Sequence, residues 1–340
     1  MTPLDRTTPG RTPERLASPL ETIFGGIQGE LDQVDRNLKA WTESPNPLVK
    51  EVSRYLFREK GKRLRPALLL LSSKLSGYSG LEDTLLAAVI ELIHTASLVH
   101  DDIIDNAPTR RGRESVHAKW GPNVTVLLGD YLYIKSIGLS LRAGDGRIVQ
   151  ILADLSARMI EGELLEYFYS GNPALTEPQY MDIIDMKTAS LFAAACQIGA
   201  VLGRAPAEEE SRLKDAGRNL GIAFQIIDDL LDFTGDARTM GKSVLLDLAE
   251  GRVTLPLIHA LDHDGRDAGR LAGLVRSRNL DAAAGREVVN FLKESGSLDY
   301  AFEKAREHSE RTHSLLGLFP DSPSREALRT LSRFILDREK

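Results

Sequence analysis

Two patterns of closely spaced aspartates are the part of this sequence best suited to chemistry. Each reads D-D-x-x-D, and the six carboxylates belong to Asp101, Asp102, Asp105, Asp228, Asp229 and Asp232. In a helix, the first and last aspartates of such a pattern share one face, and the middle one lies about 100° around it. Carboxylates grouped at the C-terminal end of a helix repel each other and the negative end of the helix dipole. A cation relieves this repulsion, and Mg²⁺ prefers carboxylate, water and phosphate oxygens as its ligands.

Basic residues alternate with these acidic patterns along the chain. Lys62 and Arg65 come just before a hydrophobic stretch and lie beside Pro66, which fits the first turn of a helix, so both would stand near a helix N-terminus that favours anions. His94 lies two helical turns before Asp101 on the same predicted face, where it can donate to a phosphate. The remaining candidates are Arg110, Arg111, Lys187, Thr188, Lys242 and Arg252. Together these residues predict a site that binds phosphate groups through Mg²⁺ and basic side chains.

Helices must position this site, because apolar residues recur with a period of 3.6 almost everywhere after residue 20 and strand-like alternation is nearly absent. We therefore predict an all-α protein, a single large helical bundle with a central apolar cavity. Four segments are apolar around most of their circumference and belong in the middle of the bundle or against another subunit, namely residues 81–105, 124–141, 188–202 and 220–233. Residues 1–20 are predicted to be a flexible leader, and residues 21–340 one helical domain.

Composition limits the function classes that remain open. The 340 residues are 42% hydrophobic and 27% charged, which is typical of a soluble globular protein. The net charge of −6 argues against binding nucleic acid through bulk charge. The single cysteine, Cys196, excludes an internal disulfide framework and a cysteine-built zinc site, and suits a cytoplasmic setting. Charged residues interrupt every long apolar stretch, so we predict no transmembrane segment.

The motifs also occur in an order typical of a known family. From about residue 48 to the end, the chain reads GKRLRP, LIHTASLVHDDIID, RRG, GD, EGE, KT, FQIIDDLLD, GK and DLAEGRVTLP. In this order the sequence resembles the trans-isoprenyl diphosphate synthases, specifically the longer-chain bacterial polyprenyl type. The resemblance implies the isoprenoid-synthase fold, a homodimer, and Mg²⁺-dependent condensation of an allylic diphosphate with isopentenyl diphosphate. We also allow for peripheral membrane association during product release.

The resemblance assigns a role to each matching residue. The six aspartates would bind about two or three Mg²⁺ ions on the allylic diphosphate, with Asp101, Asp105 and Asp228 as ligands. Isopentenyl diphosphate would be held by Lys62, Arg65, His94 and Arg111. The allylic diphosphate would be held by Arg110, Lys187, Thr188, Gln225 and Lys242, with Lys187 also counted as catalytic. Arg252 stands where family members often have Lys and would also bind substrate. Glu166 stands where longer-chain members commonly have Gln, and its carboxylate would touch either a metal-bound water or a lysine.

Product length is expected to depend on the turn of helix before Asp101. Short-chain members of the family often carry bulky aromatic residues there, whereas this chain has Ala96 and Ser97. A product tail passing along this helix would therefore find the way open. By analogy with the family we expect a product longer than about fifteen carbons, of about six to nine isoprene units. Replacing Ala96 by Phe is predicted to shorten it.

Three other functions fit part of the pattern. A class I terpene cyclase shares the D-D-x-x-D metal site but needs no second anion site, which would leave Lys62 and Arg65 without a role. A di-iron carboxylate bundle is suggested by the two E-x-x-H sequences that begin at Glu91 and Glu114. An inactive subunit of a heteromeric synthase is the third, but such partners usually have incomplete aspartate motifs, whereas both are complete here.

Overall fold

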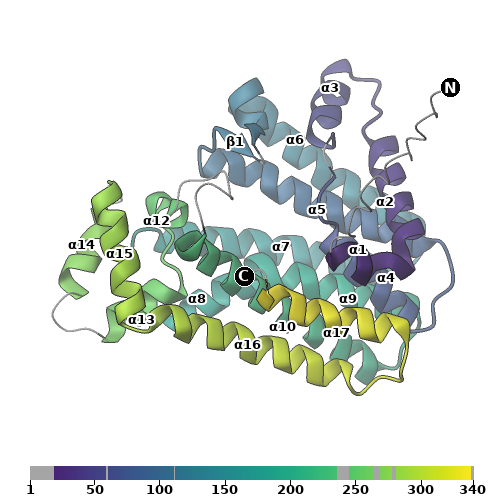
Figure 1. Cartoon of the computed structure of the whole chain (residues 1–340). Coiled ribbons are helices and arrows are strands. Elements are labelled where there is room, and N and C mark those ends of the chain that lie inside the picture. Colours follow the sequence, from purple (N-terminus) through teal and green to yellow (C-terminus); the bar gives the residue numbers. More distant parts are fainter. Residues whose placement is uncertain are drawn as a thin grey trace, which may run out of the picture.

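The computed structural model describes residues 19–58, 60–110, 112–235, 245–263, 268–277 and 281–337. Within these ranges the regular structure is helical except for two short antiparallel strands, β1 (Thr109–Arg110) and β2 (Arg113–Glu114). The predicted all-α class is therefore confirmed (Figure 1).

The α-helices of the described residues are α1 (Pro19–Phe24), α2 (Gln28–Trp41), α3 (Pro47–Leu56), α4 (Leu64–Leu75), α5 (Glu82–Ile104), α6 (Val116–Ser140), α7 (Gly146–Tyr169), α8 (Glu177–Ile184), α9 (Ser190–Leu202), α10 (Ala207–Thr234), α12 (Leu246–Glu250), α13 (Leu255–His263), α14 (Ala268–Ser277), α15 (Ala282–Glu294), α16 (Ser297–Leu316) and α17 (Pro323–Leu336). Short 3₁₀ turns, η1 (Gly25–Ile27) and η2 (Leu141–Ala143), continue the chain after α1 and α6. A π-helical turn, η3 (Asp185–Ala189), joins α8 to α9.

The core is built around α4, α5, α9 and α10. These helices pack against one another, and α9 lies against both α4 and α10. Large side chains at their contacts, such as Leu69, Ile90 and Phe192, are completely buried. Since a helix that is apolar all round needs neighbours on every side, this arrangement explains why three of the four predicted central segments form the middle of the bundle.

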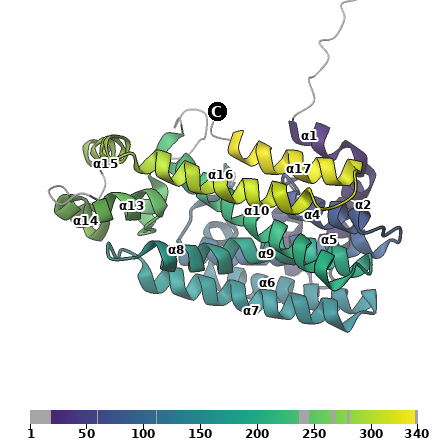
Figure 2. The same ribbon diagram turned by 90° about the horizontal axis from the view of Figure 1, so that it is seen from below.

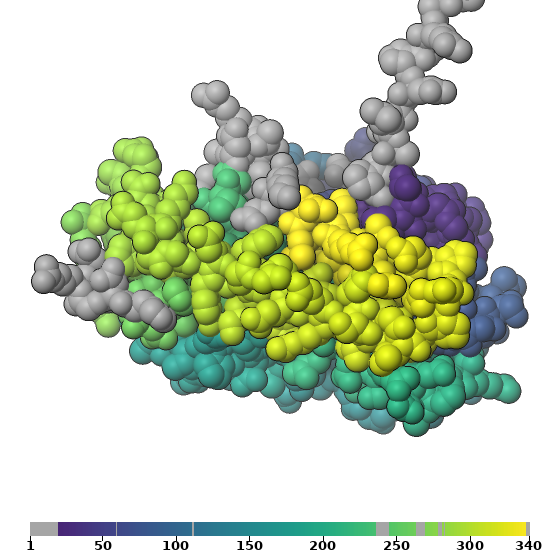
Figure 3. Space-filling view, turned by 60° about the horizontal axis from the view of Figure 1, so that its bottom comes forward, coloured from purple at the N-terminus to yellow at the C-terminus, as the bar shows by residue number. Residues whose placement is uncertain are grey.

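The C-terminal helices form an outer layer. Helix α16 packs along α10 and α13, and α17 packs against α4 and α16. Figure 3 shows these two helices, in yellow-green and yellow, covering one face of the molecule. Both helices have polar outer faces, as expected for helices that are buried on one side only.

Helix α6 differs from the other apolar segments because much of it is exposed. By length and composition alone, α5 and α6 with its extension are each apolar enough to cross a membrane, but 67% of the apolar window of α5 is buried against 39% for α6. In α6, the exposed residues Leu127 and Ile134 are seven positions apart, so they lie on the same face of the helix. The neighbouring helix α7 exposes Ile160, Leu164, Tyr167 and Phe168. Figure 2 shows both helices along one edge of the molecule, and we refer to these exposed residues as the α6/α7 face.

Candidate active site

The predicted site residues meet at one large cavity of about 1270 Å³, bordered by α4, α5, α7, α10, α12 and the turn between α8 and α9. Those that line it are Lys62, Arg65, His94, Ser97, Asp101, Asp105, Arg110, Lys187, Thr188, Gln225, Asp228, Asp229 and Arg252. Three others do not line it, namely Ala96, Asp102 and Asp232. Arg111 and Lys242 lie outside the described residues.

The first aspartate motif ends α5 and divides between two environments. Asp101 and Asp105 point into the cavity, where Asp105 forms the C-terminal cap of the helix. Desolvation raises the pKa of Asp101 to about 7, because Lys187 and Arg110, which lower it, offset the neighbouring carboxylates Glu163 and Asp105 but not the effect of burial. Asp102 is buried on the other side of the helix and accepts a hydrogen bond from Arg110 Nε at 2.5 Å.

The second motif lies near the end of α10 and divides in a similar way. Asp228 is exposed to the cavity. Asp229 is buried and accepts hydrogen bonds from Tyr180 Oη at 2.6 Å and Gln225 Nε2 at 2.7 Å. Asp232 accepts the backbone amides of Leu246 and Asp247, at 3.0 and 3.1 Å, and so begins α12. Only part of each motif is therefore available to a metal ion, while the rest holds neighbouring elements in place.

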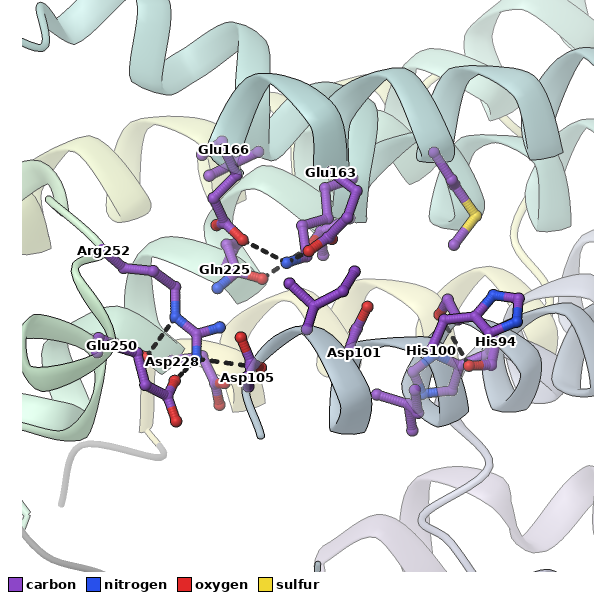
Figure 4. Close-up of a pocket in the computed structure, with 18 of the residues that line it drawn as sticks. His94, His100, Asp101, Asp105, Glu163, Glu166, Gln225, Asp228, Glu250 and Arg252 are labelled. Carbon is purple, nitrogen blue, oxygen red and sulfur yellow. Dashed lines mark hydrogen bonds and ion pairs between the residues drawn. The ribbon is translucent and has the colours of Figure 1, made fainter. Parts of the chain in front are cut away.

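Helix α7 adds two carboxylates opposite the first motif. Figure 4 shows Glu163 and Glu166 on one side of the site and Asp101 and Asp105 on the other. Lys187 Nζ lies between the two glutamates, 2.7 Å from Glu163 Oε2 and 2.5 Å from Glu166 Oε2. Desolvation works to lower the pKa of Lys187, but the carboxylates around it, Glu166 first, raise it above its ordinary value. Of the two contacts expected for Glu166, the structure contains the one to a lysine.

Arg252 connects the two halves of the site. Its guanidinium lies 3.4 Å from Asp105 Oδ2, at the end of α5, and 3.2 Å from Asp247 Oδ1 in α12. It also forms an ion pair with Glu250. Burial would lower the pKa of Arg252, but these acidic neighbours raise it. This cation reaches the first aspartate motif from a segment that follows the second one.

A separate group of basic side chains borders the cavity at α4 and α5. Helix α4 begins at Leu64, so Lys62 and Arg65 lie beside its N-terminus as predicted. Arg65 Nη1 donates to His94 Nε2 at 3.0 Å, which places the remaining ring proton of a neutral His94 on Nδ1. The guanidinium of Arg65 also lies 4.9 Å from the ring centre of Phe192. These contacts fix the direction of Arg65 at the edge of the cavity.

The acidic lining fits a hard divalent cation. Within the described part of the chain, no three His, Cys, Asp or Glu side chains converge closely enough to hold a metal ion alone. The donors that do face the cavity are carboxylates from α5, α7, α10 and α12. Mg²⁺ commonly takes a few carboxylates and completes its octahedral shell with water and phosphate oxygens, so this donor set suits it.

The two E-x-x-H sequences do not form a di-iron centre. Glu91 of α5 binds Arg63 Nη1 at 2.6 Å, and Glu114 belongs to the exposed strand β2. His117 pairs with Asn106 Oδ1 at 3.0 Å. The four residues are thus used in unrelated contacts, which rules out this alternative.

Comparison with known proteins supports the assignment of the site to one family. The sequence profile of the family described as "Polyprenyl synthetase" matches residues 46–292. The chain belongs to this family. It is 35% identical over 309 residues to the octaprenyl diphosphate synthase of Haemophilus influenzae, which covers 91% of this chain and 94% of that protein. The resemblance found in the sequence is confirmed, and the chain is a prenyltransferase of the trans-polyprenyl diphosphate synthase type.

Solved structures of family members share the fold. The polyprenyl synthase of Caulobacter crescentus CB15, complexed with calcium and isoprenyl diphosphate, has a TM-score of 0.90 at 33% identity, covering 96% of this chain and 100% of that one. The decaprenyl diphosphate synthase of Rhodobacter capsulatus also has a TM-score of 0.90 at 33% identity, covering 95% and 100%. The expected isoprenoid-synthase fold is therefore confirmed.

Sequence reasoning gave no role to several residues that this polyprenyl synthetase places in or beside the cavity. Asp247 is one, and desolvation raises its pKa to about 7 although Arg252 opposes the effect. Tyr180 is another, and its hydroxyl is buried against Asp229. Asp247 and Glu163 do lie inside motifs of the family, which is a usable signal. Tyr180 stands in no motif, and only the packing of α8 against α10 brings it to Asp229.

The glycine of the EGE motif explains how Lys187 reaches the two glutamates. A Cβ atom on Gly162 would lie 2.7 Å from the backbone nitrogen of Lys187 and 2.8 Å from Cβ of Met186. Helix α7 can approach the π-helical turn η3 this closely only because residue 162 has no side chain. The turn itself presents Lys187 to the cavity within an otherwise continuous helix, a use of π-helical geometry that is frequent at functional sites.

Replacing Gly162 by Ala is therefore expected to lower the free energy of unfolding by about 1–3 kcal/mol and to reduce elongation, because η3 must move away from α7. Urea denaturation and the initial rate of elongation measure the two effects. Gly273→Ala is the matched control: this exposed glycine of α14 has open space around it, and the change should stabilise the helix by about 0.5–1 kcal/mol without altering the rate. Equal behaviour of the two variants would contradict the close approach.

Proposed function

We propose that this polyprenyl synthetase condenses an allylic diphosphate with isopentenyl diphosphate and releases diphosphate, giving an all-trans product longer than about fifteen carbons. The observation that carries the proposal is that Asp101, Asp105 and Asp228 share one cavity with the separate basic group of Lys62, Arg65 and His94. A terpene cyclase would have no use for the second anion site. The octaprenyl and decaprenyl synthases among its relatives also support a long product, which we put at about six to nine isoprene units.

The diphosphate groups are assigned by the charge around them. We assign about two or three Mg²⁺ ions to Asp101, Asp105 and Asp228, where they would bind the allylic diphosphate. Once bound, Mg²⁺ neutralises the negative charge that develops on the departing diphosphate. The complex of the Caulobacter protein with calcium and isoprenyl diphosphate supports a divalent ion and an isoprenoid diphosphate together in this fold.

The chain's own residues then perform the remaining tasks. Lys187 and Arg252 lie where they can donate to the allylic diphosphate as its carbon–oxygen bond breaks and the electron pair leaves with the oxygen. The double bond of isopentenyl diphosphate, held by Lys62, Arg65 and His94, attacks the resulting allylic cation. His94 Nε2 already accepts from Arg65, so we assign the proton that is then lost to the departing diphosphate. Apolar lining residues such as Met159, Leu191 and Phe224 exclude water that would quench the cation.

We propose a homodimer formed through the α6/α7 face. Large apolar side chains are exposed on two adjacent helices, which supports an interaction site there, although Ile160 and Leu164 of this face also line the cavity. A second copy of the chain is the occupant that the resemblance to the family implies. The single cysteine suits the cytoplasmic location that we also propose, with peripheral association to a membrane when the apolar product is released.

Incubation of the purified chain with labelled isopentenyl diphosphate, each allylic primer and Mg²⁺ tests the proposed reaction directly. Chromatographic sizing of the products is expected to show Mg²⁺-dependent elongation past about fifteen carbons. Absence of elongation with every primer would refute the proposed function, and cyclic hydrocarbon products from the allylic primer alone would indicate a cyclase.

Binding of Mg²⁺ is expected to weaken as the pH falls from 8 to 6. Desolvation raises the pKa of Asp101 and of Asp247 to about 7, so both carboxylates take up protons below that pH, and a metal ion must displace them. Each displaced proton lowers the apparent affinity by up to about tenfold per pH unit below the pKa. Titration calorimetry with Mg²⁺ and inorganic diphosphate at pH 6, 7 and 8 measures this. An affinity independent of pH over that range would show that neither carboxylate releases a proton on binding.

A further inference from the structure

The residue between the two basic ligands of the GKRLRP motif has an unusual backbone. Arg63 adopts the left-handed conformation, with φ 54° and ψ 33°, immediately before α4. This region costs an L-residue other than glycine free energy, and such residues persist only where the surrounding contacts enforce them. Its carbonyl still accepts from Ala67 N at 3.0 Å, so the strained residue starts the helix.

Buried ion pairs hold Arg63 in this conformation. Its side chain is 11% exposed, with Nε 2.9 Å from Asp35 Oδ1 in α2 and Nη1 2.6 Å from Glu91 Oε1 in α5. Asp35 also binds Lys60 at 2.8 Å. The two carboxylates raise the pKa of Arg63 although burial opposes this. A guanidinium can bind two carboxylates from different helices at once, because its donors form a rigid fork, whereas a lysine offers one compact ammonium group.

These contacts fix the geometry of the basic end of the cavity. Lys62 and Arg65 flank Arg63 and line the cavity, and Glu91 lies one helical turn before His94 on α5. Arg63 therefore joins the start of α4 to the turn of α5 that carries His94. The hydrogen bond of 3.0 Å from Arg65 Nη1 to His94 Nε2 therefore lies next to the ion pairs of Arg63. Arg63 itself borders the cavity, but its Nε and Nη1 are engaged by Asp35 and Glu91.

We propose that Arg63 is a positioning residue for isopentenyl diphosphate: its ion pairs with Asp35 and Glu91 hold the strained loop that directs Lys62 and Arg65 towards that substrate. The inference rests on the proposed function, which supplies the substrate. It adds a residue, and two carboxylates far from the aspartate motifs, to the determinants of substrate binding. The allylic site, built on α5, α7 and α10, does not depend on this loop.

The test compares the two substrates in Arg63→Ala, Arg63→Lys and Arg63→Gly. Arg63→Ala is expected to raise KM for isopentenyl diphosphate about tenfold or more, with KM for the allylic primer changed less than about twofold, since a tenfold change corresponds to about 1.4 kcal/mol. Arg63→Lys should recover only part of the loss. Arg63→Gly relieves the backbone strain but removes both anchors, so it should recover thermal stability relative to Arg63→Ala without recovering the low KM.

Calorimetric binding of isopentenyl diphosphate without any allylic primer provides a second measurement that does not depend on turnover. Arg325→Ala is the matched control, because Arg325 is 15% exposed, donates to Phe319 O at 2.7 Å and lies in α17 away from the cavity. It is expected to change stability but neither KM. If Arg63→Ala fails to fold, Asp35→Asn and Glu91→Gln each remove one anchor and should shift the same KM in the same direction.

An unchanged affinity for isopentenyl diphosphate in these variants would overturn the inference, as would equal increases in both KM values. If the wild-type chain elongates normally, either of these results leaves the proposed function intact. A wild-type chain that elongates no primer refutes the proposed function instead, so the two failures are distinguishable.

Discussion

Replacing Asp101 by Asn lowers kcat by about 10²–10³-fold in our expectation, which corresponds to about 3–4 kcal/mol of transition-state stabilisation. Asp101 is a carboxylate of the first motif that lines the cavity, and desolvation makes its pKa respond strongly to a nearby cation. An amide of the same shape keeps the packing but removes the charge that a metal ion requires. Initial rates of elongation at saturating Mg²⁺, with circular dichroism to verify helicity, measure the effect.

The neighbouring aspartate provides the sharpest control. Asp102 is buried and bonded to Arg110 instead of lining the cavity. We therefore expect Asp102→Asn to act mainly through Arg110, raising KM for the allylic primer by about tenfold or less, because the amide oxygen can still accept from Arg110 and only the charge is lost. Equal losses of kcat for Asp101→Asn and Asp102→Asn would contradict the division of the motif into a cavity side and a buried side.

Replacing Ser97 by Phe is expected to move the product distribution to clearly shorter chains. Ser97 lies one turn before Asp101 on the cavity side of α5, so an aromatic ring there would obstruct a tail running along the helix. Rates for the first condensation should change little, because the Ser97 hydroxyl donates to the backbone carbonyl of His94 at 2.9 Å and not to an aspartate side chain. Reverse-phase chromatography of the dephosphorylated products measures the shift.

Ala96→Phe separates the cavity wall from the core behind it. The sequence analysis assigned both Ala96 and Ser97 to the wall along which the product tail runs. In the structure, however, Ala96 is fully buried and does not line the cavity. A ring at residue 96 should therefore destabilise the fold by about 1–3 kcal/mol or more through overpacking, with a smaller effect on product length than Ser97→Phe. A normal product profile in Ser97→Phe, with a shortened one in a stable Ala96→Phe, would assign the wall to residue 96.

The sequence predicted the helices well because their apolar residues recur with a clear period. It also predicted that both aspartate motifs come near helix ends and that basic groups gather around them, since charge and spacing are local properties. The exposure of α6 could not be predicted from the same period, because a segment that is apolar all round fits a bundle centre and a subunit interface equally well.

The use of each carboxylate could not be predicted, because it depends on long-range packing. The three aspartates of one motif look equivalent in sequence, yet Asp232 caps α12 while Asp228 faces the cavity. Tyr180 gave no signal, and Arg63 gave none beyond its place in the GKRLRP motif, since the partners that define their roles lie far away along the chain. A strained φ, such as that of Arg63, has no signature in the sequence when the residue is not glycine.

The central claim is that one bound diphosphate, through divalent ions, joins the C-terminal parts of α5 and α10. Titration calorimetry of an unreactive allylic diphosphate analogue, with and without Mg²⁺, tests it in the wild type, Asp101→Asn, Asp228→Asn and the double variant. We predict that binding requires Mg²⁺ and that the double variant loses little more affinity than either single one, because both groups hold the same ligand. Tight binding without Mg²⁺, or losses that simply add, would show that the two aspartate motifs do not share a ligand.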